Sequence, residues 1–334
     1  RCSEKQLPVR PFFSFGRPDA RHKVDTVLQY RKSRIASGTD EKSQPGVGDF
    51  FIRDKAARKA DHCCPYHHPA VRFPESREQL VILLGLAEEC GIRPFLLGRG
   101  TNLLVSDRGL DTLVIKTAER MTSIRRLDDV TLEADVGVLL SRLAVYAQQA
   151  GLAGLEFAFG IPGTVGGAVY MNAGAYGGEI KDVLTAVTFL DENLHLQTLP
   201  VQELQLGYRT SIFERRSWCI LEAEFTLHPG DAQEIHTAMQ EYMRRRKEKQ
   251  PLEYPSAGST FKRPVGQFAG KLIEDCGLRG FRVGGAAISE KHCGFVVNLG
   301  NATCADVVSL TEQVRQIVLE KTGCTLEREI RVVE

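Results

Sequence analysis

The chain has 334 residues, the composition of an ordinary globular protein and a formal net charge of +1. Its length allows two or three domains with sizeable cores. The balanced charge gives no argument for a nucleic acid or a membrane surface as a partner, and no apolar run is long enough to span a bilayer. Nine scattered cysteines favour reduced thiols in a cytoplasm over a disulfide framework.

Residues 1–70 differ from the rest of the chain, because they are rich in basic residues and show little periodicity. The cluster Asp61-His-Cys-Cys-Pro-Tyr-His-His68 offers metal-ligand side chains, but its spacing matches no familiar metal motif. The adjacent Cys63 and Cys64 also cannot easily chelate one ion together. We therefore predict no metal site and interpret residues 1–70 as a divergent leader, either disordered or translated from an altered reading frame.

The first regular element is a helix, since the capping box Ser76-Arg-Glu-Gln79 precedes an apolar face that ends at Gly91. Beyond it, short apolar runs predict strands near 94–97, 103–106, 112–116 and 131–138. A helix is predicted over 139–150, ended by Gly151.

A glycine-rich segment at 160–178 is the most distinctive stretch of the chain, because seven of its nineteen residues are glycine. Such a density is costly unless the backbone turns left-handed or approaches something closely. Successive free N–H groups in such turns suit phosphate oxygens. The segment therefore predicts a cradle for a flat, phosphate-bearing ligand, and a tight crossover inside a β-rich core is the alternative.

The sequence contains neither of the two familiar nucleotide-binding motifs, the dinucleotide fingerprint and the P-loop. Gly98-Arg-Gly-Thr-Asn102 lacks the third glycine and the downstream acid of a dinucleotide fingerprint, and the chain has no Walker lysine.

The rest of the chain alternates strands and helices. A capping box Asp231-Ala-Gln-Glu234 opens a helix whose basic last turn, 244–247, opposes the negative end of the helix dipole, so we interpret that run as a solvated helix end. Strands are predicted at 183–190, 219–227, 294–299 and 326–333, and helices at 268–276 and 307–321. The fold class is α+β, with a domain boundary near Leu227.

Six ordered motifs resemble one family, the UDP-N-acetylenolpyruvoylglucosamine reductases (UDP-N-acetylmuramate dehydrogenases). They are Leu97-Gly-Arg-Gly-Thr-Asn-Leu-Leu-Val-Ser106, Gly160-Ile-Pro-Gly-Thr-Val-Gly-Gly-Ala-Val-Tyr-Met-Asn-Ala-Gly-Ala175, Gly207-Tyr-Arg-Thr-Ser-Ile-Phe213, Ser256-Ala-Gly-Ser-Thr-Phe-Lys-Arg-Pro264, Ala269-Gly-Lys-Leu-Ile-Glu274 and Leu326-Glu-Arg-Glu-Ile-Arg331. The short stretch from Phe213 to Ser256 is similar to the compact branch of the family, which lacks a tyrosine-bearing clamp loop. The resemblance implies an FAD-binding domain of the vanillyl-alcohol-oxidase or PCMH type at 71–227 and a UDP-sugar substrate domain at 228–334.

The resemblance also implies the reaction, in which NADPH reduces non-covalent FAD and hydride then passes to the enolpyruvyl ether of UDP-N-acetylglucosamine. It implies that Arg209 binds the carboxylate of the substrate, a role that suits a planar and permanently charged guanidinium. It makes Ser259 the proton donor to the carbanion, and Glu329 a group that positions and polarises the intermediate. Taken one at a time, each residue also has a purely structural interpretation. Arg209 could form a surface ion pair, Ser259 could be a turn residue, and Glu329 could be a solvated residue of the last strand.

The same resemblance supplies the binding residues. Expected contacts to FAD are Gly98, Arg99, Gly100, Thr101, Asn102, Pro162, Gly163, Thr164, Gly166, Gly167, Asn172, Ala173 and Gly174. Expected contacts to the substrate are Tyr208, Lys249, Lys262 and Arg331. We expect a small-molecule substrate, a monomeric bacterial enzyme of peptidoglycan synthesis in the cytoplasm, and neither nucleic acid nor membrane as a partner.

The front of the chain departs from the family, which begins its flavin domain with a strand and a Thr-x-Phe-x-x-Gly-Gly-Pro turn. His67-His-Pro-Ala-Val-Arg72 occupies that place here. Two alternatives therefore stay open beside the reductase. One is a non-catalytic, flavin-poor relative, and the other is a flavin oxidase of the same superfamily.

Overall fold

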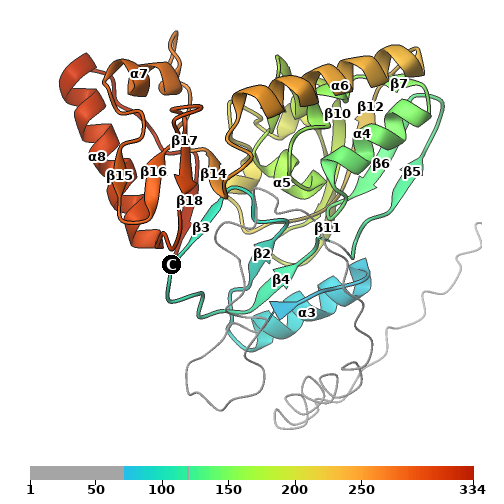
Figure 1. Ribbon diagram of the computed structural model, residues 1–334. Coiled ribbons are helices and arrows are strands. Elements are labelled where there is room, and N and C mark those ends of the chain that lie inside the picture. The colour runs from blue at the N-terminus through green and yellow to red at the C-terminus, as the bar shows by residue number, and fades with distance from the viewer. Residues whose placement is uncertain (1–70, 119) are drawn as a thin grey trace, which may run out of the picture. The chain divides into compact units, whose positions relative to one another are not determined.

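The computed structural model describes residues 71–118 and 120–334 (Figure 1). The predicted leader, including the Asp61–His68 cluster, lies outside the described residues. Within the described ranges, no helix combines the length and the apolar character that crossing a bilayer requires.

The first part of the fold is a small parallel sheet with a helix beside it. β1 (Val71–Arg72) and β2 (Phe95–Leu97) flank β4 (Val114–Lys116). Helix α3 (Arg77–Glu89) starts where Ser76 caps it by accepting from the Gln79 N–H at 3.3 Å. The predicted capping box is incomplete, because the Gln79 side chain accepts from the Glu75 N–H instead.

A five-stranded antiparallel sheet forms the centre of the flavin half, and its apolar core takes in helices from both sides of the glycine-rich segment. The strand order is β11 (Leu196–Pro200), β10 (Leu184–Leu190), β12 (Cys219–Thr226), β6 (Thr131–Asp135) and β5 (Ile124–Arg126). Helices α4 (Leu140–Gln149), α5 (Val165–Tyr170) and α6 (Ala232–Lys249) contribute buried side chains to the same core. A short ribbon of β7 (Leu152–Ala153) and β13 (His228–Pro229) links α4 to α6.

Helix α6 lies beyond the predicted boundary at Leu227, yet its buried Ile235 and Met239 belong to the core of the flavin half. In sequence beyond α6, the second core begins at Ala257. Helix α6 therefore packs with the first core, and the domain bounds 71–227 and 228–334 stay a prediction.

The second core combines an antiparallel sheet with two helices. The sheet order is β14 (Ser256–Ser259), β17 (Phe295–Asn298), β16 (Ala286–Ile288) and β15 (Arg282–Val283), and the helices are α7 (Ala269–Asp275) and α8 (Cys304–Thr322). Helix α8 starts earlier than its apolar pattern predicts, because Thr303 and Asp306 form a reciprocal capping box. It ends as predicted at Gly323, whose φ of 70° suits glycine.

The C-terminal segment ties the two halves together. Its last residues form β18 (Arg331–Val333), which pairs in parallel with β3 (Leu103–Val105) directly after the Gly98–Asn102 turn. The predicted strand at 326–333 is therefore shorter than expected. Its first half instead runs along Phe261, where the Glu329 N–H donates to the Thr260 carbonyl at 2.9 Å.

The glycine-rich segment folds into α5 followed by a hairpin of β8 (Gly174–Ala175) and β9 (Gly178–Glu179). Arg246, in the last turn of α6, is half-buried and donates to the Gly160 carbonyl at the start of this segment. The interpretation of the basic run as a solvated helix end is therefore wrong for Arg246. It holds for Arg244 and Arg245, which are exposed and pair with Glu241 on the same helix.

Candidate active site

The centre of the candidate site is an ion pair between residues 120 positions apart. Arg209 Nε donates to Glu329 Oε1 at 2.8 Å, and the side chains are only 18% and 12% exposed. The guanidinium also donates to the carbonyls of Asn172 and Gly174, at 3.4 and 2.9 Å. The structure thus brings together the substrate-carboxylate residue and the glutamate that the sequence predicts.

Burial is the main influence on Glu329, and it raises the pKa of this carboxyl above its ordinary value. The positive charges of Arg209 and Lys262 act in the opposite direction. A buried carboxyl whose pKa is shifted by desolvation and by two neighbouring cations is typical of a functional site.

A cavity of about 410 Å³ opens beside this pair, and Ser259 lies in its wall together with Arg209 and Glu329. Ser259 is exposed at the end of β14, where Gly258 has a φ of +67° and the register with β17 shifts. A bulge of this kind re-aims the side chain that follows it. Among the described residues, the Ser259 hydroxyl has no hydrogen-bond partner, so it is available to a ligand.

The cavity wall also contains residues that were not predicted as site residues, some of which lie in the family motifs. They are Phe261, Arg263, Phe268, Ala269, Gly270, Lys271, Glu274, Arg279, Lys291, His292, Cys293 and Gly294. His292 Nδ1 accepts from the Gly294 N–H at 3.0 Å, which leaves the proton of the neutral ring on Nε2. Burial lowers the pKa of this imidazole and favours that neutral form. Neither the spacing of the residues around His292 nor the family motifs gave a signal that could have indicated it.

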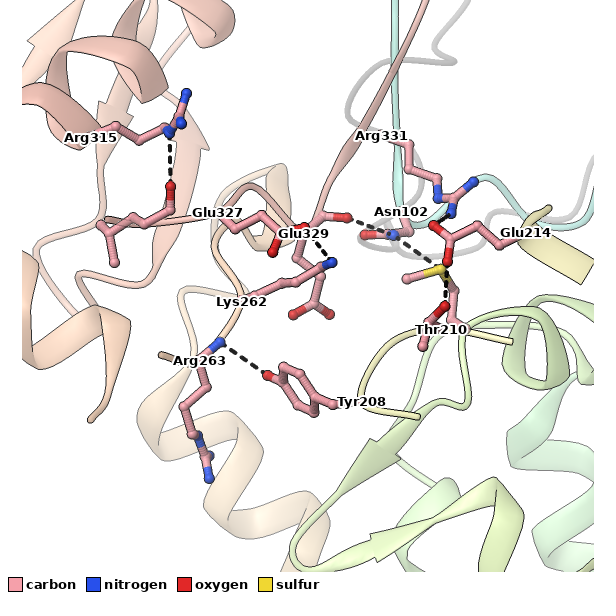
Figure 2. Close-up of polar contacts among 12 residues, drawn as sticks. Asn102, Tyr208, Thr210, Glu214, Lys262, Arg263, Arg315, Glu327, Glu329 and Arg331 are labelled. Atoms are coloured by element: carbon pink, nitrogen blue, oxygen red, sulfur yellow. Dashed lines mark hydrogen bonds and ion pairs between the residues drawn. The ribbon is translucent and has the colours of Figure 1, made fainter. Parts of the chain in front are cut away.

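The predicted substrate contacts fall into two groups. Tyr208 lines the cavity, and its hydroxyl accepts from the Arg263 N–H at 3.2 Å, while Lys262 pairs with Glu327 (Figure 2). Lys249 has no ion-pair partner in the described part of the chain and lies close enough to lower the pKa of His292. Arg331 instead donates to Tyr170 Oη at 2.7 Å and to Glu214, and it does not line the cavity. Its predicted role as a substrate contact stays a prediction.

The two segments predicted to bind FAD lie against each other. A side-chain Cβ built on Gly98 would meet Thr164 Oγ1 at 2.7 Å, and one on Gly163 would lie 3.9 Å from Thr101 Oγ1. Along the turn, the five N–H groups of Gly98–Asn102 donate to no backbone carbonyl within the described residues. Consecutive unpaired donors of this kind form an anion-binding nest, so the residues present fit the pyrophosphate of a dinucleotide such as FAD.

The two predicted asparagine contacts have other partners. Asn102 Nδ2 donates to the Glu329 carbonyl at 3.1 Å (Figure 2). Asn172 is fully buried, and its amide hydrogen-bonds to Gly207, Glu179 and Lys181. A side-chain contact between Asn172 and FAD stays a prediction without support from this geometry.

Comparisons with known proteins agree with the site. The family described as "UDP-N-acetylenolpyruvoylglucosamine reductase, C-terminal domain" matches residues 250–333, and the family described as "FAD binding domain" matches residues 69–199. A UDP-N-acetylenolpyruvoylglucosamine reductase from Caldanaerobacter subterraneus subsp. tengcongensis is 49% identical over 288 residues, covering 86% of this chain and 94% of the relative. One from Caldicellulosiruptor bescii is 49% identical over 263 residues, covering 78% and 83%.

A solved structure is similar as well. The crystal structure of UDP-N-acetylenolpyruvylglucosamine reductase from Thermus caldophilus has a TM-score of 0.68 and 37% identity, covering 79% of this chain and 92% of that chain. These findings confirm the predicted α+β fold class, with an FAD-binding domain and a C-terminal domain specific to the family, and they confirm FAD as the cofactor. The chain therefore belongs to the UDP-N-acetylenolpyruvoylglucosamine reductase family of FAD-dependent oxidoreductases.

Proposed function

We propose that the chain reduces the enolpyruvyl ether of UDP-N-acetylglucosamine to UDP-N-acetylmuramate with NADPH, as a step of bacterial peptidoglycan synthesis. The observation that carries the proposal is the meeting of Arg209, Ser259 and Glu329, from three distant segments, in the wall of one cavity.

The residues of the Gly98–Asn102 turn and of the glycine-rich segment would hold FAD, which supplies hydride transfer from NADPH to the substrate double bond. Arg209 would bind the substrate carboxylate, because its guanidinium keeps its charge at any working pH and can contact two oxygens. As negative charge develops next to that carboxylate, the same cation stabilises it.

Ser259 would donate its hydroxyl proton to the carbanion carbon. A hydroxyl is a weak acid, so it serves only against a strong base, and its availability in the cavity wall fits that role. Glu329 would orient Arg209 through their 2.8 Å hydrogen bond and act on the intermediate from the same side.

Cations in the cavity wall and near it suit the diphosphate of the substrate. Lys249 lies near His292 and has no ion-pair partner in the described ranges, whereas Lys271 and Arg279 already pair with Asp275 and Glu274. We assign the diphosphate to Lys249 first. We further propose a monomer that works in the cytoplasm, in keeping with the six unpaired cysteines of the described chain.

The direct test is flavin chemistry on the purified chain supplied with FAD. NADPH should bleach the yellow flavin anaerobically, and colour should return only when the enolpyruvyl substrate is added. Colour that returns with oxygen alone at an equal rate would favour the oxidase, and a chain that takes up no FAD would favour the non-catalytic relative.

A further inference from the structure

Asn172 occupies an unusual place for a polar residue, because it is 0% exposed and has a φ of +40°. Its Nδ2 donates to the Gly207 carbonyl at 2.9 Å and to Glu179 Oε2 at 3.1 Å. Its Oδ1 accepts from the Lys181 N–H at 3.0 Å. Three of the four hydrogen-bonding positions of the amide are therefore used by protein groups. The fourth, a second lone pair on Oδ1, belongs to a side chain that is 0% exposed and does not face a ligand site.

The Gly207 carbonyl belongs to the tight turn that carries Arg209. Gly207 and Thr210 exchange two backbone hydrogen bonds, of 3.1 and 3.4 Å, across Tyr208 and Arg209. Arg209 has a φ of +55°, a left-handed conformation that is unfavourable for a non-glycine residue. Surrounding contacts must hold such a residue, and the Asn172 side chain provides one of them.

The other end of Arg209 reaches the same residue. Nη1 donates to the backbone carbonyl of Asn172 at 3.4 Å, and Nη2 donates to the carbonyl of Gly174 at 2.9 Å. Asn172 thus contacts the turn that contains Arg209 through its side chain, and the Arg209 guanidinium through its backbone carbonyl. The only other polar partner of that tip in the described chain is Glu329.

We propose that Asn172 is a positioning residue that fixes the turn and the guanidinium of Arg209, and not a side-chain contact to FAD. An amide is required because its Nδ2 donates to two acceptors at once, one of them the Glu179 carboxylate. An aspartate of the same shape would offer only acceptors and would face that carboxylate with a second negative charge. The inference rests on the proposed function, since it names the step that depends on Arg209.

Two substitutions test this role. Asn172→Asp keeps the shape and tolerates the left-handed backbone, and Asn172→Gly removes the side chain without backbone strain. Thr188→Val is the control, because it removes a buried hydroxyl, which hydrogen-bonds to the exposed Thr198 at 3.0 Å, in the same half of the molecule. Each change is made in the wild type and again in an Arg209→Lys background.

In the wild-type background, we expect both Asn172 variants to lose about 10- to 100-fold in substrate turnover, because a small displacement of a catalytic group is that costly. Flavin content and the rate of flavin reduction by NADPH should match the wild type. In the Arg209→Lys background the same changes should cost less than about threefold, since residues that act through one another are not additive. Equal losses in both backgrounds, or loss of FAD in step with activity, would overturn the inference.

A second readout needs no turnover. The Arg209 Nε–H, bonded to Glu329, should give a slowly exchanging NMR signal that is absent in Arg209→Lys. It should exchange fast in both Asn172 variants and stay slow in Thr188→Val; a slow signal in all of them would contradict the positioning role. If the wild type fails to turn over the enolpyruvyl substrate, the proposed function fails, and this signal still decides the role of Asn172.

Discussion

At the scale of single residues, the site depends on the carboxyl of Glu329, whose pKa is shifted in opposite directions by burial and by nearby positive charges. Burial raises the pKa of Glu329, and Arg209 and Lys262 lower it. Lys262 is the cation that can be changed without breaking the Arg209–Glu329 hydrogen bond, since its Nζ is paired with Glu327.

Lys262→Met should therefore raise the pKa of Glu329 further. A folded-state pKa above the ordinary 4.5 means that stability falls as the pH rises from 4.5 through the raised pKa. In the variant, the loss of stability should again begin near pH 4.5 but should continue to a higher pH than in the wild type, because the folded-state pKa of Glu329 is higher. The pKa is measured by NMR titration of the carboxyl signal that Glu329→Gln removes.

Glu327→Gln is the matched control, because it removes the same surface ion pair and leaves the Lys262 charge in place. Its ion pair involves a glutamate that is 69% exposed, so its loss should cost at most about 1 kcal/mol at any pH. A Glu329 pKa that does not move in Lys262→Met would contradict this electrostatic account.

At the scale of elements, helix α6 packs Ile235 and Met239 into the core of the flavin half, and in its basic last turn one arginine adds a contact. Arg246 donates to the Gly160 carbonyl, and burial lowers the pKa of its guanidinium. Arg244, two residues away, only pairs with Glu241 and Glu248 on the helix surface.

Arg246→Met should lower the free energy of unfolding by about 1–2 kcal/mol, because it leaves the Gly160 carbonyl without its donor. Arg244→Met should cost about 0.5 kcal/mol or less, as exposed helix pairs do. Urea unfolding of both variants makes the comparison, and an equal cost for the two would show that the contact to Gly160 adds nothing.

The elements also show what a sequence can predict. Helices α3, α4 and α8 follow from their caps and apolar faces, because those signals are local. The FAD-binding domain follows from the family motifs, and the assignment of FAD contacts to Gly98–Asn102 and to the glycine-rich segment stays a prediction. The Glu329 segment was predicted as strand, but it pairs with residues 260–262 instead, since a partner 67 positions away decides its conformation.

The roles of the two asparagines and of Arg246 were also beyond the sequence. Asn102 and Asn172 lie in flavin-binding motifs, and only the folded chain shows their side chains turned toward Glu329 and toward the Arg209 turn. Arg246 lies in a run of four cations, and nothing local distinguishes it from its exposed neighbours.

At the scale of the whole molecule, the two cores determine which thiols can react. Cys219, Cys276, Cys293 and Cys304 are buried, whereas Cys90 is exposed. Burial raises the pKa of Cys219 to about 12, so this thiol carries almost no reactive thiolate near neutral pH.

In the native protein, iodoacetamide should therefore label Cys90 much faster than Cys219. In denaturant, the two labelling rates should become equal. Peptide mass mapping measures both sites in one sample. Native labelling of Cys219 as fast as Cys90 would mean that the core of the five-stranded sheet opens readily.

The central claim concerns the cavity where the two halves contribute Arg209, Ser259 and Glu329. The measurement that tests it most directly is stopped-flow spectroscopy of Ser259→Ala, with Ser309→Ala on the exposed face of α8 as control. The account predicts that NADPH reduces the flavin of Ser259→Ala at the wild-type rate, while reoxidation by the enolpyruvyl substrate slows by a factor of about 10² or more. An equal slowing of both half-reactions, or an unchanged reoxidation, would contradict it.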